Sequence, residues 1–405
     1  MKPRQAGKNI LNMQSSRPTQ PFCEERVNSY PFYSPRFWAG MRFTDYLKLL
    51  SRNRFRVHPT RIPMMFMVGG CSVFSSGLAL TQKMLLNRKI EATELKEPPI
   101  FIIGHWRSGT TLLHEMLCLD DQFSWPSTFE CFVPAYHNLT RPFLHPLLKL
   151  LMPSKRPMDS MPVGPELPQE DEFALLGLGA PTPYDRIAFP NEPTKFARML
   201  NLKDAAPDEA DALASALKWF YQSLSYKNPK RLMLKSPTHT GRIAHLAKWF
   251  PGAKFIHITR NPHKIFPSSV HLWNSLSAVQ GFQSVPKDDQ VLVELVNHWY
   301  QEVYTGFFEQ VDQISNDDIV HLAFEDLIQD PITQIEAIYS SFDLSGFDKA
   351  RPNLESYWSQ RKSHRKNKTQ LNDETKALIN EVWAEYIDHF GYSSTESKSG
   401  FVKAG

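Results

Sequence analysis

Cysteine is scarce in this chain, since 405 residues contain only 4, at positions 23, 71, 118 and 131. They form no C-x-x-C pair, and no His/Cys cluster has the spacing of a zinc site. We therefore expect no metal, and free thiols in a reducing, cytoplasmic setting. The N-terminal residues also lack the apolar run of a secretory signal peptide.

A large excess of charge is missing as well. There are 46 Lys and Arg against 42 Asp and Glu, a formal net charge of +4. This excess is too small for a dedicated duplex-DNA binder, so we expect no nucleic-acid partner, although a local basic pocket for an anionic ligand is allowed. The hydrophobic fraction of 41% excludes a wholly disordered chain.

Long uncharged runs are rare, and the most conspicuous one covers residues 62–82, between Arg61 and Lys83. It is long enough to cross a bilayer, which takes about 20 apolar residues. It also contains Pro63 together with several glycines and serines. Two interpretations stay open: a helix packed on the domain that follows, and a membrane contact that would make a cytoplasmic protein membrane-associated.

From residue 99 onward, strand patterns alternate with helix patterns. Short apolar runs rich in β-branched residues predict strands at 100–103, 231–235, 253–259 and 318–324. Such alternation predicts an α/β fold of three layers, with a central parallel sheet flanked by helices. We expect an N-terminal arm and apolar segment over residues 1–98, one catalytic domain over 99–392 and a flexible tail over 393–405.

The first strand leads directly into the sequence GHWRSGTTLL, which begins at Gly104, and then into a helix pattern. A strand, a glycine loop and a helix N-terminus in this order build a cradle for anions. The spacing resembles the nucleotide-binding pattern G-x-x-x-x-G-K-[ST], with matches at Gly104, Gly109 and Thr111. Thr110 stands where that pattern has Lys, and the cation of the loop is Arg107.

The loop is similar to the 5′-phosphosulfate loop of sulfotransferases that use 3′-phosphoadenosine 5′-phosphosulfate (PAPS), in the branch with an RSGTT loop. The resemblance implies a P-loop-like fold and in-line transfer of a sulfuryl group from PAPS to an acceptor hydroxyl, with 3′-phosphoadenosine 5′-phosphate (PAP) as product. It also implies that the 5′-phosphate and the sulfate are held by Arg107, Ser108, Gly109, Thr110 and Thr111.

Two later motifs extend the resemblance over about residues 99–392. Arg260 follows a strand and Ser268 lies eight residues later, which is the form of the family's 3′-phosphate site. An Arg supplies a bidentate fork for phosphate, and a Ser hydroxyl supplies a second donor. Lys235 ends another strand, in the LKSP sequence, and the resemblance implies a cation near the sulfate there.

A basic run lies near the C-terminus, in the sequence WSQRKSHRKNK from Trp358 to Lys368. Related enzymes close over the 3′-phosphate with a basic loop near the last helix. We therefore include Arg361 and Lys362 among the donor-binding residues. A solvated charge run stays open as the alternative.

Transfer to a hydroxyl needs stabilised charge on the sulfuryl oxygens and a base for the hydroxyl proton. We expect Arg107 and Lys235 to stabilise the charge. The resemblance to branches acting on carbohydrates and on protein tyrosine implies Glu130 as the base, and a polar residue on an edge loop stays open. The cluster Glu170, Asp171 and Glu172 is a rival that binds acceptor hydroxyls, acts as the base or caps a helix.

The acceptor is expected to be a hydroxyl-bearing small molecule or a glycan, with Glu170, Asp171 and His239 as candidate contacts. An aromatic content of 12% suits a sugar, although aromatic residues are more often part of a core. Two alternatives to sulfuryl transfer are a P-loop kinase or NTPase with an altered loop, and a nucleotide-binding scaffold without catalysis. The kinase alternative needs a loop Lys that the sequence does not have.

Overall fold

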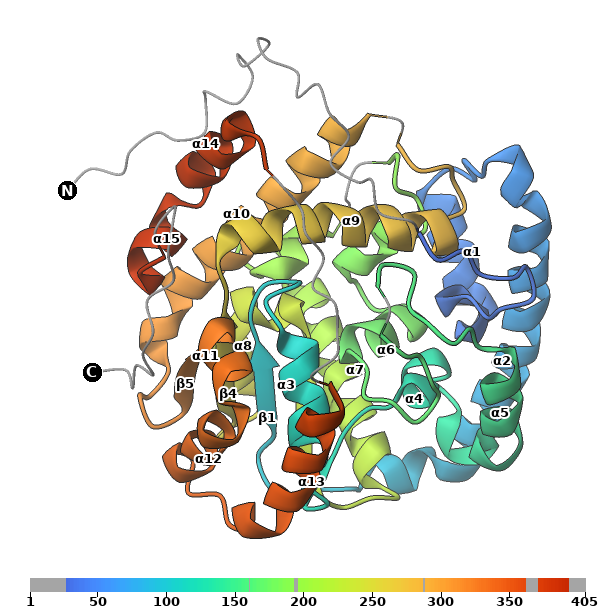
Figure 1. The fold of residues 1–405 in the computed structure, drawn as a ribbon. Coiled ribbons are helices and arrows are strands. Elements are labelled where there is room, and N and C mark those ends of the chain that lie inside the picture. The colour runs from blue at the N-terminus through green and yellow to red at the C-terminus, as the bar shows by residue number, and fades with distance from the viewer. Residues whose placement is uncertain (1–26, 160, 193–195, 287, 362–370, 393–405) are drawn as a thin grey trace.

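A five-stranded parallel sheet lies at the centre of the computed structural model, which describes residues 27–159, 161–192, 196–286, 288–361 and 371–392 (Figure 1). The strand order is β2-β3-β1-β4-β5. The strands are β1 (Ile100–Ile103), β2 (Phe123–Ser124), β3 (Arg231–Lys235), β4 (Lys254–Thr259) and β5 (Ile319–Ala323). The four predicted strands are confirmed. The short edge strand β2 had no apolar run long enough to predict it.

Helices connect and cover these strands. In chain order they are α1 (Phe43–Arg52), α2 (Ile62–Glu91), α3 (Thr110–Leu117), α4 (Thr128–Phe132), α5 (His137–Leu151), α6 (Asp171–Gly177), α7 (Pro207–Ser225), α8 (Ile243–Trp249), α9 (Pro262–Gln280), α10 (Asp289–Gln310), α11 (Phe324–Gln329), α12 (Pro331–Ser341), α13 (Phe347–Arg361), α14 (Asp373–Val382) and α15 (Ala384–Phe390). The sequence pattern from Pro237 through Phe250 predicts one helix, and the structure has a 3₁₀ helix, η6 (Pro237–Arg242), followed by α8.

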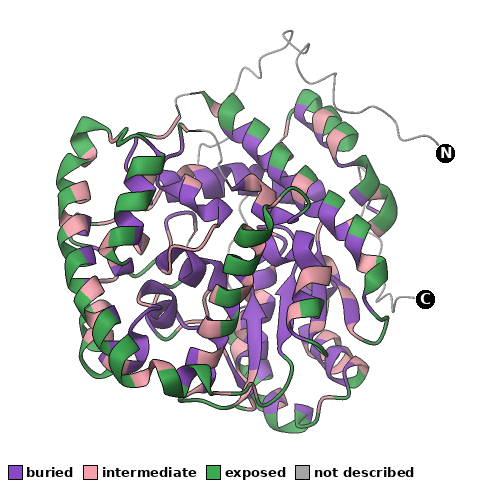
Figure 2. Ribbon diagram, turned by 180° about the vertical axis from the view of Figure 1, so that it is seen from behind, coloured by how far each residue is buried: buried purple, intermediate pink, exposed green. Residues whose placement is uncertain are grey.

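The sheet is buried on both faces, as the purple strands in Figure 2 show. Successive side chains of a strand point to opposite faces, so each strand contributes to two cores. Phe101 of β1 belongs to the core that includes residues of α7, α8 and α10. Its neighbour Ile102 belongs to the core that includes residues of α3, α12 and α13. The predicted three-layer α/β fold is confirmed.

The apolar segment at 62–82 lies within α2, a helix of 30 residues along the edge of the molecule (Figure 1). One face packs on the domain through side chains such as Val68 and Ala79, and α2 contacts α1, α5 and α7. Trp38 and Tyr46, from the predicted N-terminal arm, belong to the same core as the sheet residue Phe101. The arm and the apolar segment are therefore packed on the α/β domain.

The sequence pattern predicts a last helix over 373–390, with Asn372 or Asp373 as its N-cap and Gly391 as its end. The structure divides this helix into α14 and α15 at Trp383, whose ring stacks on Tyr300 with centroids 3.8 Å apart. The two ends are confirmed. The Asn372 side chain accepts a hydrogen bond from the Thr375 amide at 2.9 Å, and Gly391 ends α15 with a φ of 69°. The tail predicted over 393–405 lies outside the described residues.

The strand order creates a topological switch point at the carboxyl ends of β1 and β4. These two strands are neighbours, but the chain leaves β1 toward β2 and leaves β4 toward β5, on opposite sides of the sheet. Ligands of open α/β sheets bind at such a switch point. Lys235 ends β3 in register with Ile102 of β1, so the predicted loop, Lys235 and Arg260 all lie at one edge of the sheet.

Candidate functional site

The loop after β1 has the backbone geometry of an anion cradle. Gly104 and Gly109 have φ values of 141° and 106°, in the region that side chains disfavour. A Cβ on Gly104 would lie 2.3 Å from the Ile258 carbonyl oxygen, and one on Gly109 would lie 2.2 Å from the Phe324 ring. The loop ends at the N-terminus of α3, which adds partial positive charge.

Two side chains of this loop carry signs of a binding role. Arg107 has a φ of 69°, an uncommon conformation for a residue with a side chain and one that clusters at functional sites. The Ser108 hydroxyl is buried and has no hydrogen-bond partner in the described part of the chain. A phosphate oxygen is a group that such a hydroxyl would bind, so the loop residues fit a phosphosulfate.

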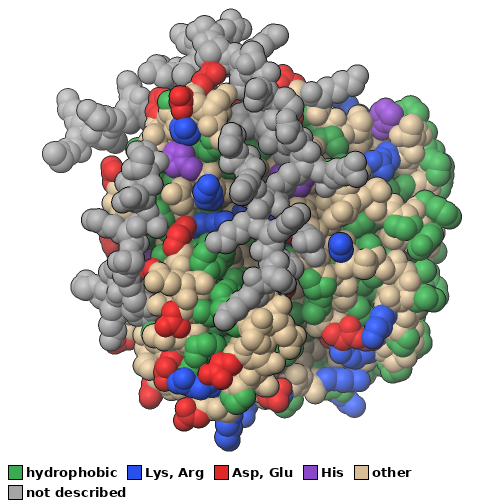
Figure 3. All heavy atoms as spheres, in the orientation of Figure 1, with side chains coloured by type: hydrophobic (Ala, Val, Ile, Leu, Met, Phe, Trp, Pro, Cys, Tyr) green, Lys and Arg blue, Asp and Glu red, His purple; other side chains and the backbone are tan. Residues whose placement is uncertain are grey.

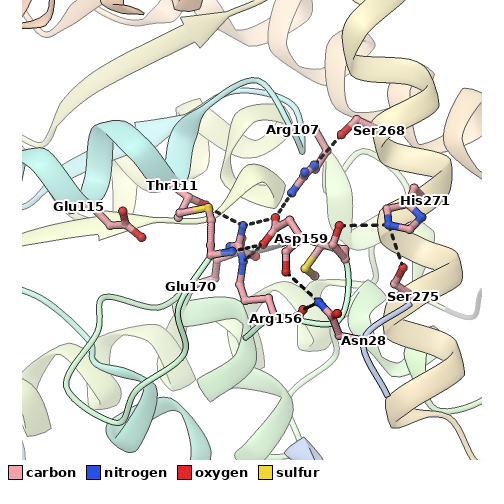
Figure 4. Close-up of polar contacts among 12 residues, drawn as sticks. Asn28, Arg107, Thr111, Glu115, Arg156, Asp159, Glu170, Ser268, His271 and Ser275 are labelled. Carbon is pink, nitrogen blue, oxygen red and sulfur yellow. Dashed lines mark hydrogen bonds and ion pairs between the residues drawn. The ribbon is translucent and has the colours of Figure 1, made fainter. Parts of the chain in front are cut away.

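Arg107 joins the two predicted phosphate motifs. Its Nε donates to Oγ of Ser268 on α9 at 2.8 Å (Figure 4). Its carbonyl oxygen accepts from Nη1 of Arg260 at 2.8 Å. The Arg260 guanidinium lies 4.3 Å from the centroid of the Phe324 ring, and burial lowers its pKa. The structure thus brings Arg107, Arg260 and Ser268 together at the switch point between β1 and β4.

Lys235 extends the same group of cations from β3. Its ammonium lies 2.7 Å from Oε1 of Glu170 and 3.5 Å from Oγ1 of Thr111. Glu170 also accepts a hydrogen bond from the Tyr184 hydroxyl at 2.5 Å, and Tyr184 in turn accepts one from Nε1 of Trp106 at 2.8 Å. Glu170 is therefore connected to the loop on both sides, through Lys235 and through Tyr184.

The other two carboxylates of the cluster face the interior. Asp171 accepts hydrogen bonds from the Tyr221 hydroxyl at 2.5 Å, from Nε2 of His239 at 2.9 Å and from Ser236. Burial by itself would raise the pKa of Asp171, but His239 and the hydrogen bonds together hold that pKa below its ordinary value. The side chains of Asp171 and His239 are 0% exposed.

Glu172 completes a set of three pairs. It accepts hydrogen bonds from Thr182 at 2.5 Å and from Thr238 at 2.6 Å, and it forms a wholly buried ion pair with Arg242. Glu170, Asp171 and Glu172 thus each pair with a basic residue of β3 or η6. These contacts hold the start of α6 against the end of β3. The helix-capping alternative does not hold for the N-cap residue Glu170, whose side chain makes no capping hydrogen bond. The Glu172 amide in the first turn of α6 donates instead to Oγ of Ser236 at 3.2 Å.

Glu130 lies in a different environment. It is the third residue of α4 and forms a capping box with Ser127, whose backbone amide donates to Oε2 at 2.8 Å. Its other oxygen, Oε1, pairs with the half-exposed Arg141. The contacts of Glu130 are thus to α4 and α5 and not to the loop or Lys235.

Arg361 lies against the helix that follows the loop. Its Nη1 donates to Oε2 of Glu115 on α3 at 2.9 Å, and Tyr357 also donates to Glu115, at 2.5 Å. The end of α13 is thereby joined to α3, one turn beyond Thr111. Lys362 lies outside the described residues.

Sequence reasoning missed Arg156 and Asp159. Oδ2 of Asp159 accepts from Nη1 of Arg107 at 2.9 Å, and Arg156 pairs with both carboxylate oxygens (Figure 4). Both residues come from a proline-rich loop without a recognisable motif. Asp159 is 52 residues from Arg107 in the sequence. Tyr184, which connects Glu170 to Trp106 of the loop, lies in the same proline-rich region and was missed for the same reason.

Comparisons with known proteins find relatives over most of the chain. A sequence model described as "Sulfotransferase family" matches residues 98–349. The omega-hydroxy-beta-dihydromenaquinone-9 sulfotransferases Stf3 of Mycobacterium bovis and Mycobacterium tuberculosis are each 37% identical over 367 residues, covering 91% of this chain and 94% of theirs.

Two solved structures share the fold. Sulfotransferase STF9 from Mycobacterium avium has a TM-score of 0.62 at 17% identity, and the match covers 89% of this chain and 98% of that one. Sulfotransferase STF1 from Mycobacterium tuberculosis has a TM-score of 0.54 at 16% identity, with 85% and 92% covered.

Proposed function

The chain belongs to the sulfotransferase family and transfers a sulfuryl group to a hydroxyl acceptor, and from this premise we propose which residues hold PAPS and which residue takes the acceptor proton. Members of the family generally use PAPS as donor. Family membership decides against the kinase and the scaffold as alternatives. The observation that carries the donor assignment is the contact of Arg107 with both Ser268 and Arg260 at the switch point of the sheet.

We assign the 5′-phosphosulfate to Arg107 and to Ser108, Gly109, Thr110 and Thr111, at the N-terminus of α3. The 3′-phosphate is assigned to Arg260 and Ser268, since an Arg fork and a hydroxyl are good partners of phosphate oxygens. We also assign Arg361 to this site, and its ion pair with Glu115 on α3 supports that assignment. PAPS, when bound, supplies an activated sulfuryl group. The chain then supplies the cations Arg107 and Lys235, which stabilise charge during an in-line displacement.

Glu170 is our choice as the base, in place of Glu130. A base must reach the acceptor hydroxyl next to the sulfuryl group, and Glu170 is paired with Lys235, which contacts Thr111 of the loop. Glu130 is engaged by Ser127 and Arg141 instead. Asp171 and His239 were candidates for acceptor contact. Since both are 0% exposed, we propose that they hold Glu170 and Lys235 in place from the interior.

The acceptor is proposed to be a lipid with a hydroxyl group. The Stf3 relatives are named for a hydroxylated menaquinone derivative, and 37% identity over nearly the whole chain supports an acceptor of the same class here. We prefer this small-molecule acceptor to a glycan, which had the aromatic content and the carboxylates of residues 170–172 in its favour.

A membrane contact would give the enzyme access to such a lipid. The outer side of α2 and the adjoining α5 expose large apolar side chains, which Figure 3 shows as green spheres along the edge where α2 runs. This α2/α5 apolar face consists of Ile62, Phe66, Val73, Phe74, Leu80, Met84, Leu85, Phe143, Leu147 and Leu150. Phe66 is 70% exposed and Met84 is 77% exposed.

We propose that α2 lies in the plane of the membrane surface. Residues 59–91 have the length and composition to cross a membrane, but α2 is packed on the domain from Val68 to Ile90, which leaves only one face for lipid. Acidic residues are absent from α2 until its last residue, Glu91. Three basic residues, Lys83, Arg88 and Lys89, are exposed near the same end and suit an anionic leaflet. Cys71, Cys118 and Cys131 are free, which agrees with the cytoplasmic side.

Calorimetry with PAP and with AMP tests the donor site. PAP should bind at least about tenfold more tightly, because only PAP has the 3′-phosphate that Arg260 and Ser268 are assigned to hold. Equal affinities would overturn this assignment.

Transfer from radiolabelled PAPS to a hydroxylated menaquinone in mixed micelles tests the acceptor. Transfer to sugars but not to this lipid would overturn the acceptor class.

A further inference from the structure

The carboxylate of Asp159 lies between two arginines at the predicted donor site. Its Oδ2 accepts from Nη1 of Arg107 at 2.9 Å and from Nη2 of Arg156 at 2.6 Å, and its Oδ1 accepts from Nε of Arg156 at 3.0 Å (Figure 4). An Arg fork binds carboxylate and phosphate with the same geometry. Asp159 therefore presents to Arg107 the kind of group that the donor's 5′-phosphosulfate would present.

This arrangement is fixed from several sides. The Asn28 side chain donates to the carbonyl oxygens of Arg156 and Asp159 at 2.7 and 3.0 Å, and Nε2 of His271 on α9 lies 3.0 Å from the Met158 carbonyl oxygen. The Met161 amide donates to Oδ1 of Asp159 at 3.1 Å. The backbone that carries Arg156 and Asp159 is thus held in place against the loop and α9.

The charge of Asp159 follows from its neighbours. Burial alone would raise the pKa of Asp159, but the charges and hydrogen bonds of Arg156 and Arg107 hold it well below its ordinary value. The carboxylate is therefore ionised at neutral pH. Arg156 also interacts electrostatically with Glu115 on α3 and with the proposed base Glu170, and both carboxylates raise its pKa.

Resting on the proposed donor site, we propose that Asp159 competes with the 5′-phosphosulfate for Arg107 and Arg156, and that Arg156 is an additional donor-binding residue. Two anions cannot share the same guanidinium groups without mutual repulsion, so binding of the donor displaces the carboxylate. The return of Asp159 to Arg107 then favours release of PAP, whose 5′-phosphate uses the same cations. Asp159 thereby weakens the binding of donor and product alike.

Asp159→Asn removes the competing charge and keeps the shape of the side chain. It should tighten PAP and AMP by the same factor, about tenfold, and leave adenosine unchanged, because only the 5′-phosphate meets Arg107. The rate constant for PAP release should fall with it. Asp318→Asn is the matched control: Asp318 is also paired with a basic side chain, Lys254, but at the amino end of the sheet.

The competition is overturned if Asp159→Asn binds PAP as the unchanged protein does, or more weakly, since weaker binding means that Asp159 only positions the arginines.

Arg156→Gln is a separate test, since it leaves the pair of Asp159 with Arg107 in place. It should weaken PAP and AMP about tenfold, and unchanged binding would remove Arg156 from the donor site. Failure of the proposed donor site itself is distinguished because the unaltered enzyme would then bind PAP no better than AMP.

Discussion

Nζ of Lys235 lies 2.7 Å from Oε1 of Glu170, at the point where the end of β3 meets the start of α6. The same ammonium is 3.5 Å from Oγ1 of Thr111, where the loop after β1 enters α3. One cation thus lies between the predicted position of the sulfuryl group and the proposed base. This arrangement is what a reaction needs if negative charge develops on the sulfuryl oxygens while a proton leaves the acceptor beside them.

Glu170→Gln should remove the base and keep the shape of the side chain. The expected result is a fall of kcat by about 100-fold or more, the typical contribution of a general base. The affinity for PAP, measured by calorimetry, should change little, because the assigned phosphate contacts come from other residues.

Glu130→Gln is the matched control. Gln also serves at the third position of a capping box, so α4 keeps its cap, and an ion pair with a half-exposed Arg contributes at most about 1 kcal/mol. We expect a kcat close to that of the unchanged enzyme. If Glu130→Gln loses turnover and Glu170→Gln retains it, the base is Glu130, as the family resemblance first implied.

Gly109→Ala should disrupt the phosphate loop. Its Cβ would meet the Phe324 ring at 2.2 Å, and its φ of 106° disfavours any side chain, at a cost of about 1–2 kcal/mol before the clash is counted. The affinity for PAP should fall at least about tenfold, as measured by calorimetry.

Gly77→Ala is the control for this change. Its added Cβ meets nothing within 4 Å, and Ala favours the helix by about 1 kcal/mol over Gly. PAP binding should be unchanged and the melting temperature equal or higher. Unchanged PAP affinity in Gly109→Ala would contradict the assignment of this loop to the donor.

The strands and the phosphate motifs could be predicted because their signals are local. Buried parallel strands are continuous apolar runs, and Gly104, Lys235 and Arg260 each directly follow or end one. Parallel strands then bring their carboxyl ends to one edge, so the meeting of Arg107 with Arg260 follows from topology. The role of Glu130 was also locally readable, since Ser127-Thr-Phe-Glu130 has the spacing of a capping box.

The pairing of charges could not be predicted in the same way. Lys235 and Glu170 are 65 residues apart, and Asp159 and Arg107 are 52 apart. No periodicity links such positions, and which carboxylate meets which cation depends on how the loop-rich region from 152 to 195 folds back over the sheet. The exposed face of α2 could not be predicted from the sequence either. Apolar residues lie on all sides of this helix, so the sequence pattern does not show which side packs on the domain.

Acid should destabilise the protein through its buried histidines. Burial, with Lys235 nearby, lowers the pKa of His114 from 6.5 to about 3. Below pH 6.5 the unfolded chain therefore binds a proton that the folded chain does not, and stability is lost as the pH falls from 6.5 toward 3. From pH 6.5 to pH 5 this amounts to about 2 kcal/mol for one histidine.

Urea unfolding at several pH values measures this effect. His114→Gln should reduce the slope of stability against pH by about one proton in this range, whereas His298→Gln, at an exposed position of α10, is the control for removing a histidine. Part of the slope should remain in His114→Gln, because burial also lowers the pKa of His105, to about 4. An unchanged slope in His114→Gln would show that His114 is protonated in the folded state.

Serine in place of Phe66, Val73, Leu80 and Met84 should release the enzyme from lipid. These side chains lie on the outer side of α2 and are exposed, so the folded protein loses little packing while the face loses its apolar surface. Flotation with vesicles of phosphatidylcholine and phosphatidylglycerol should show at least about tenfold weaker binding. Val291→Ser, an exposed apolar position on α10, is the control.

The same vesicles distinguish a helix in the membrane plane from one that crosses it. A helix packed on its domain along one face is held at the surface by its outer side chains and by charge, so high salt and alkaline carbonate should extract the protein. A crossing helix would stay in the lipid under both treatments.

With a soluble acceptor, kcat of the four-serine variant should equal that of the unchanged enzyme. With the acceptor embedded in vesicles, its rate should fall in proportion to the lost binding. Equal rates on embedded acceptor would mean that α2 does not bring the enzyme to its substrate.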